Sequence, residues 1–157
     1  MKPLDILGVR VEMPTNTPIV LLRERDGLRH LPIWIGAAEA TAIAYAQQGV
    51  VPPRPLTHDL LVNVLAALGS GLALVRIERI DEGVYYATLV LSSGQEIDSR
   101  ASDAIALAIR AGAEVVAPAE LLDSAGILLP EEADDEVQKF KEFLDHVSPE
   151  DFDTPEP

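Results

Sequence analysis

The chain contains no cysteine. This absence excludes disulfide bonds, thiol catalysis, thiolate zinc sites and iron–sulfur clusters, and it is consistent with a reducing compartment. The N-terminal residues lack the basic and apolar regions of a secretory signal, and no apolar run approaches the roughly 20 residues that cross a membrane. The sequence therefore predicts a cytoplasmic protein that makes no contact with a membrane.

Aromatic residues are also scarce, at 4% of the 157 residues, whereas hydrophobic residues of all kinds make up 48%. This composition is typical of a globular protein whose core is built from Leu, Ile, Val and Ala. The length fits one domain. The only tryptophan, Trp34, is expected to pack in the core or at a subunit interface, and with apolar strand edges it favours a homodimer.

Basic residues are outnumbered, and the net charge of −14 is unevenly distributed. Residues 131–157 hold eleven acids against two lysines, a balance of −9, which leaves −5 for the other 130 residues. We expect a domain over residues 1–130, followed by an acidic C-terminal helix and frayed tail over residues 131–157. An acidic protein does not attract nucleic acid through its overall field, so such a substrate needs a local basic group or a metal ion.

Hydrophobic periodicity and turn residues outline an α+β fold. Strands are expected over residues 4–13, 19–24, 29–35, 72–80, 84–91, 95–98 and 115–117, helices over residues 37–48, 57–68 and 101–111, and a helical turn over residues 119–124. Gly8 is expected to mark a β-bulge, and Pro32 an edge or irregular position. The order of elements predicts a mixed, largely antiparallel sheet packed with about three helices. In the tail, a helix over residues 135–147 is expected to dock through an apolar stripe of Val137, Phe140 and Leu144.

Several cofactor classes are not expected. The sequence has no glycine-rich phosphate loop, no nucleophile elbow and no pair of histidines at metal-ligand spacing. Without these motifs and without cysteine, no haem, flavin, nucleotide or iron–sulfur cluster is expected.

Three carboxylates, Glu39, Asp59 and Asp103, fall in the first turns of the three predicted helices. An acid in this position interacts favourably with the helix dipole, and this interaction alone can account for the presence of each acid. Together they suit a magnesium or manganese ion, which binds oxygen ligands. The spacing leaves open whether the three side chains converge.

Polar and basic residues accompany these acids. Thr57 is expected to cap the second helix, and Ser102 or Ser99 the third. His58 lies beside Thr57 at a helix start, where exposed N–H groups favour an anion. Arg54 and Arg100 precede the second and third helices, and each either binds a phosphate or neutralises the nearby acids.

Three motifs occur in a specific order: LPIWIG at residues 31–36 followed by Glu39, RPLTHDL at residues 54–60, and SRASDAIALA at residues 99–108. Together they resemble the bifunctional nuclease domain family over residues 4–130. The resemblance implies a compact, dimeric α+β domain and, less directly, the hydrolysis of DNA and RNA, an activity attached to plant members. The motif residues are Glu39, Arg54, Thr57, His58, Asp59, Arg100, Ser102 and Asp103.

Two hypotheses follow from the resemblance. In the first, the chain is a nuclease in which Glu39, Asp59 and Asp103 hold the metal ion, and His58 acts as the general base or positions the water. Arg54, Arg100, Thr57 and Ser102 then bind the substrate. In the second, the chain is a non-enzymatic dimeric binding or regulatory module, in which the same acids serve as caps and ion pairs. The mild negative charge and scarce aromatics of the domain favour the second hypothesis, and the family name favours the first.

Overall fold

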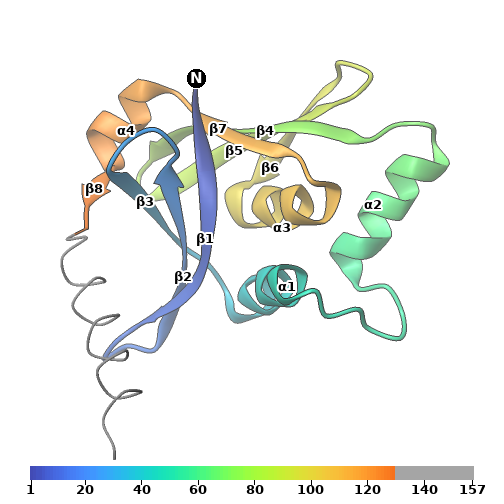
Figure 1. Ribbon diagram of the computed structural model, residues 1–157, viewed down its shortest axis with the longest axis horizontal. Coiled ribbons are helices and arrows are strands. Elements are labelled where there is room, and N and C mark those ends of the chain that lie inside the picture. The colour runs from blue at the N-terminus through green and yellow to red at the C-terminus, as the bar shows by residue number, and fades with distance from the viewer. Residues whose placement is uncertain (130–157) are drawn as a thin grey trace, which may run out of the picture.

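Apolar strands build one eight-stranded sheet in a computed structural model that describes residues 1–129 (Figure 1). The strands are β1 (Lys2–Glu12), β2 (Thr17–Glu24), β3 (Arg29–Trp34), β4 (Leu72–Asp81), β5 (Val84–Leu91), β6 (Glu96–Arg100), β7 (Glu114–Ala117) and β8 (Ile127–Leu128). The helices are α1 (Ala37–Gln48), α2 (Thr57–Ala67), α3 (Ala101–Ala111) and α4 (Ala119–Ala125). The expected α+β class is confirmed.

The sheet has the order β6-β5-β4-β7-β1-β2-β3-β8. All neighbouring strands are antiparallel except β4 and β7, which are parallel. A parallel pair needs a crossover connection, and the chain between β4 and β7 supplies one that contains α3. The mixed, largely antiparallel sheet predicted from the sequence is therefore present.

Gly8 produces a bulge where β1 meets the first helix. The register between β1 and β2 shifts between Ile6 and Gly8, and Gly8 has a φ of +127°. A Cβ at this position would lie 2.9 Å from Oε1 of Gln47, whose amide donates to the Ile6 carbonyl. The glycine thus lets α1 approach β1 closely, as the sequence suggested.

Helix α3 is the centre of the core. Seven of its eleven residues are buried, four of them alanines, and it packs against α1, α2 and strands β4 and β5 (Figure 1). Small side chains let neighbouring elements approach the helix on several sides at once. By contrast, α2 packs mainly on α3, and none of its residues is fully buried.

The helix caps differ from the prediction. The N-cap residue of α2 is Leu56, which makes Thr57 the first helical residue, and the N-cap of α3 is Arg100; neither has a side-chain cap hydrogen bond. The hydroxyl of Ser99 donates to the Arg100 carbonyl. Thr57, Ser99 and Ser102 therefore do not cap these helices, because the acids of the first turns and the preceding extended residues set where each helix begins.

Trp34 does not pack in the core, and that part of its prediction was wrong. The residue is 56% exposed, and its indole Nε1 donates to Oε2 of Glu12 at 2.8 Å. It lies near the end of β3, where pairing with β8 has already stopped at His30, so the chain around Pro32 has β2 as its only neighbouring strand among residues 1–129. A role of Trp34 at a subunit interface stays a prediction.

Three further points concern the short strand β8, the C-terminal segment and the length of the helices. The two-residue strand β8 was not predicted, because it is too short to show periodicity. The acidic C-terminal helix, with Val137, Phe140 and Leu144, lies outside the described residues. Within residues 1–129, none of the helices has both the length and the apolar character needed to cross a membrane.

Candidate functional site

Four of the eight sequence-predicted residues converge in one hydrogen-bonded cluster, which we call the Asp103 cluster: Glu39, His58, Arg100 and Asp103. Oδ1 of Asp103 lies 2.9 Å from Nε2 of His58. The guanidinium of Arg100 donates to Asp103 through Nε at 2.8 Å and through Nη2 at 3.1 Å. The same Nη2 donates to Oε1 of Glu39 at 2.9 Å.

Three helix starts bring this cluster together. Glu39 lies in the first turn of α1, His58 in the first turn of α2, and Asp103 in the first turn of α3. Arg100 is the last residue of β6 and the N-cap residue of α3, so its side chain reaches Asp103 three residues ahead. Helices α1 and α2 both pack on α3, and from their first turns Glu39 contacts Arg100 and His58 contacts Asp103.

The cluster holds its carboxylates in the ionised form. Burial raises the pKa of Asp103, but hydrogen bonds from Arg100 and His58 outweigh it, so the net pKa lies below the ordinary value of 3.8. A hydrogen bond from Arg100 likewise lowers the pKa of Glu39. Reciprocally, Asp103 and Glu39 raise the pKa of Arg100, which stays charged. Two negative charges therefore face one permanent positive charge beside a histidine.

The Asp103 carboxylate also fixes the tautomer of His58. An ionised carboxylate only accepts hydrogen bonds, so the contact requires that Nε2 of His58 carries the proton. In the neutral ring Nδ1 is then the proton acceptor. The His58 side chain is 15% exposed and that of Asp103 is 30% exposed, which leaves the pair open to a small reactant. An arrangement of this kind can accept a proton from water.

Asp59 does not join the Asp103 cluster. Its Oδ2 accepts from the backbone N–H of Leu56 at 3.0 Å, and its Oδ1 accepts from Nε of Arg110 at 2.6 Å. The hydrogen bond from Arg110 is the main reason why the pKa of Asp59 is lowered. Asp59 therefore stabilises the start of α2 and ties that helix to α3.

Arg110 is the residue of this region that the sequence analysis missed. Besides Asp59, it donates to the carbonyl oxygens of Ala106 and Ala42 at 2.9 and 3.0 Å, and its side chain is 9% exposed. It thus joins α1, α2 and α3 at one point. The available signal was an arginine that ends the apolar run of residues 104–109 in α3, where it has to find buried acceptors.

The other three predicted residues take different places. Thr57 lines the pocket beside the Asp103 cluster, whereas Ser102 is buried and lines a second pocket. Arg54 is exposed in the proline-rich connection and lines neither pocket. A role of Arg54 in binding a phosphate or in neutralising nearby acids stays a prediction.

The donor set does not fit the magnesium or manganese ion that the sequence suggested. Both oxygens of Asp59 are engaged by Leu56 and Arg110, and both oxygens of Asp103 accept from Arg100. Within residues 1–129, no group of three or more His, Asp or Glu side chains is arranged to hold a metal ion. The cation at this site is the guanidinium of Arg100.

A pocket of about 770 Å³ opens beside the Asp103 cluster. Glu39, His58, Arg100 and Asp103 all belong to its lining. The other lining residues are apolar or uncharged, apart from Asp98: Ala38, Thr41, Ala42, Leu56, Thr57, Leu61, Leu89, Ile97, Ser99 and Leu107. A largely apolar lining with a few charged groups is usual for a small-molecule site.

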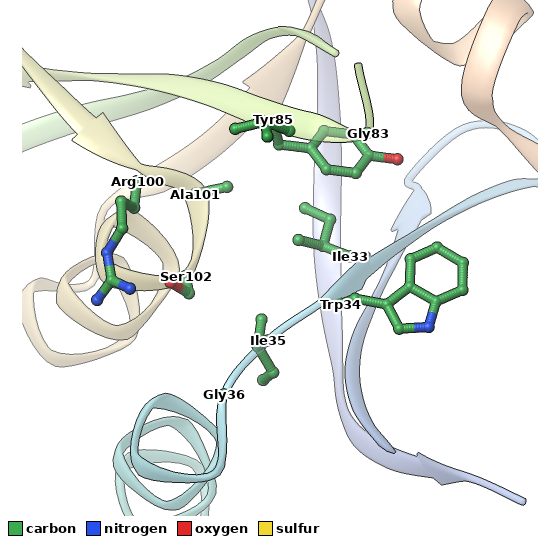
Figure 2. A pocket seen from close by; sticks show the side chains of 10 residues that line it. Ile33, Trp34, Ile35, Gly36, Gly83, Tyr85, Arg100, Ala101 and Ser102 are labelled. Carbon is green, nitrogen blue, oxygen red and sulfur yellow. The ribbon is translucent and has the colours of Figure 1, made fainter. Parts of the chain in front are cut away.

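Arg100 also belongs to the lining of a second, smaller pocket of about 340 Å³. Figure 2 shows Arg100 and Ser102 at the start of α3 on one side of this pocket, with Ile33 and Ile35 of the β3 end across from them. The hydroxyl of Tyr85, from β5, donates to the Pro32 carbonyl at 3.1 Å and holds the two sides together. Arg100 therefore stands between two hollows.

The fold and site define a class of α+β domain in which an Asp–His pair and an exposed arginine meet at the edge of an apolar pocket. The sequence model of the bifunctional nuclease domain family matches residues 20–130, and the chain belongs to this family. Strand β1 precedes the match, yet it lies between β7 and β2 within the sheet.

Two proteins of Mycobacterium tuberculosis are similar to this chain along its whole length. They are "Uncharacterized protein MT1877" of strain CDC 1551 / Oshkosh and "Uncharacterized protein Rv1829" of strain ATCC 25618 / H37Rv. Each is 50% identical over 161 aligned residues, which cover 97% of this chain and 98% of the relative. Neither name states an activity, so the reaction has to be argued from the site.

Proposed function

We propose that this protein hydrolyses phosphodiester bonds of nucleic acid at the Asp103 cluster, with His58 as the general base. The observation that carries the proposal is the contact of 2.9 Å between Nε2 of His58 and Oδ1 of Asp103 at the rim of a pocket. Membership of the bifunctional nuclease domain family supports the choice of substrate. The site supplies the proton transfer and the positive charge that this hydrolysis needs without a metal ligand set.

In the proposed reaction, Nδ1 of His58 removes a proton from water as the water oxygen attacks phosphorus. The bond between phosphorus and the leaving oxygen breaks, the leaving oxygen takes a proton from solvent water, and His58 returns its own proton to solvent, so that a phosphomonoester and an alcohol are formed. Asp103 keeps the ring in the required tautomer and stabilises the imidazolium that forms. Its lowered pKa ensures that it stays ionised near neutral pH.

Arg100 is proposed to bind the scissile phosphate. Its Nε and Nη2 atoms are occupied by Asp103 and Glu39, whereas Nη1 makes no hydrogen bond with any of residues 1–129. The side chain is 66% exposed, so this nitrogen can donate to a phosphate oxygen. Glu39 then acts as a positioning residue that holds the guanidinium in place.

The test compares two asparagine variants on a single-stranded oligonucleotide. Asp103→Asn removes the charge that orients His58 and should lower the cleavage rate by a factor of about 10² or more. Asp5→Asn is the matched control, because Asp5 also pairs with an arginine, Arg25, at an exposed site. Equal rates in the two variants would contradict the proposed role of Asp103.

A second candidate function, a dimeric binding module, is favoured by one observation on α2. Leu60, Val64 and Leu68 form a stripe at helical spacing, which we call the α2 stripe, and they are 53, 42 and 77% exposed. The stripe contains no charged residue, on a chain whose net charge is −14. We propose that a second copy of the chain covers it, because an uncharged face is where two like-charged copies can approach.

A further inference from the structure

We infer that the larger pocket beside the Asp103 cluster holds one unpaired nucleobase, and that the protein therefore acts on single-stranded nucleic acid. This inference rests on the proposed hydrolysis, because it takes the phosphate to lie on Arg100. It adds a base-binding site, formed by α1, α2, α3 and the end of the sheet, to the reacting groups at the rim.

The lining of this pocket combines charged and aliphatic side chains. Its charged residues are Glu39, Asp98, Arg100 and Asp103. Its large aliphatic residues, which we call the base-pocket walls, are Leu56, Leu61, Leu89, Ile97 and Leu107. They come from α2, β5, β6 and α3, so the pocket exists only when the helices and the sheet edge are assembled.

A nucleobase matches this combination of surfaces. Its two faces are apolar and suit aliphatic walls, and its edges carry donors that the hydroxyl oxygens of Thr41, Thr57 and Ser99 in the same lining can accept. The hydroxyls of Thr41 and Ser99 already donate to the carbonyls of Ala37 and Arg100 and therefore serve as acceptors. The volume of about 770 Å³ falls within the roughly 300–1,000 Å³ of pockets that enclose small organic ligands. The attached backbone would then pass the rim, where Arg100 can bind a phosphate.

A pocket for one base favours single-stranded nucleic acid over a duplex. A base in a duplex is stacked and paired, and it has to be extruded before a pocket can take it. A base in a single strand needs much less rearrangement. Single strands and unpaired ends are therefore the expected substrates.

Ile97 offers a sharp test of this inference. It is 43% exposed on the edge strand β6 and lines the pocket, so Ile97→Trp fills the pocket on a strand where tryptophan is favoured. Ile80 is 37% exposed on β4 and lines neither of the two pockets that Arg100 borders, so Ile80→Trp is the matched control. Both changes are made in the full chain with His58→Ala, which prevents cleavage during the measurement.

Binding of a labelled single-stranded oligonucleotide is measured by fluorescence polarisation and compared with that of a duplex of the same sequence. We expect binding of the single strand to be at least about tenfold tighter than that of the duplex, and Ile97→Trp to weaken it about tenfold. Ile80→Trp should change it less than twofold. Equal binding of single strand and duplex, or equal effects of the two tryptophans, would overturn the inference.

A second measurement does not depend on the tryptophan variants. The protein with His58→Ala alone, bound to the labelled oligonucleotide, is titrated with a nucleoside monophosphate and, separately, with ribose 5-phosphate, which has the phosphate and sugar but no base. Displacement of the oligonucleotide only by the nucleotide supports the base pocket, and equal displacement by both compounds refutes it. If pocket-dependent binding is found but cleavage does not depend on His58, then the base pocket stands and the proposed hydrolysis fails.

Discussion

At the scale of single residues, two arginines decide what the three helix-start acids can do. Arg100 joins Glu39 to Asp103, whereas Arg110 draws Asp59 to the opposite side of the α2 start. A carboxylate in the first turn of a helix thus belongs to the Asp103 cluster in α1 and α3, whereas in α2 it joins two helices. The difference lies in the arginine that each acid meets.

The lowered pKa of Asp59 predicts how stability depends on pH. Because the hydrogen bond from Arg110 puts the folded pKa below the ordinary value of 3.8, the stabilisation is complete above that value and is lost as the pH falls below it. Asp59→Asn keeps an acceptor for the Leu56 N–H but removes the charge. We expect it to lower the free energy of unfolding by about 1–2 kcal/mol at neutral pH.

Urea denaturation at several pH values checks this prediction. The difference between wild type and Asp59→Asn should shrink as the pH falls below about 4, since the wild-type carboxyl then becomes protonated. Asp26→Asn, in an exposed turn, is the control and should change the unfolding free energy by less than about 0.5 kcal/mol. A difference that does not vary with pH would show that the charge of Asp59 contributes nothing.

At the scale of helices and strands, left-handed glycines end α1 and α3. Gly49 and Gly112 are the C-cap residues, with φ values of +69° and +66°. An added Cβ at Gly112 would meet no atom within 4 Å, so only the backbone conformation opposes a side chain there. The end of α3 matters because Arg110 lies two residues before this glycine.

Gly112→Ala should therefore destabilise the protein by about 1 kcal/mol. Gly71→Ala is the matched control, because Gly71 lacks a positive φ and its added Cβ would make only an ordinary contact of 3.9 Å with Ser92. The midpoints of guanidinium denaturation give the comparison. If the two alanine variants are equally stable, the left-handed conformation at Gly112 carries no cost.

The elements that the sequence predicted well are those with a strong local signal. Helices α1 and α3 both end where an alanine-rich segment meets a glycine, and both matched the expected bounds. The caps did not match, since a Thr or Ser near a helix start does not reveal which residue is the last extended one. The contact between His58 and Asp103 spans 45 positions in the chain, so spacing could suggest the acids but not their partners.

At the scale of the whole molecule, the α2 stripe is an exposed apolar surface that the contacts within one chain do not explain. Leu68, 77% exposed, lies at its end, and no residue of α2 is fully buried. Apolar patches of this kind mark interaction sites on folded proteins. A dimer that buries the α2 stripe would also hold the helix that carries His58.

Light scattering tests the proposed dimer. At micromolar concentration we expect a mass of twice the 16.9 kDa of one chain, and Leu68→Glu should give a monomer by placing a charge in the interface. Leu28→Glu is the control, because Leu28 is also exposed, at 59%, but lies in the turn before β3. A monomeric wild type, or a dimer that survives Leu68→Glu, would contradict this arrangement.

The central claim is that the protein hydrolyses a phosphodiester with His58 as the general base, oriented by Asp103, and without a bound metal ion. The most direct measurement is the cleavage rate of a single-stranded oligonucleotide in excess EDTA, for wild type and for His58→Ala purified in the same way. We predict that the wild-type rate persists in EDTA and that His58→Ala lowers it by a factor of about 10²–10⁴. Loss of wild-type cleavage in EDTA that manganese or magnesium restores, or equal rates in the two proteins, would contradict the claim.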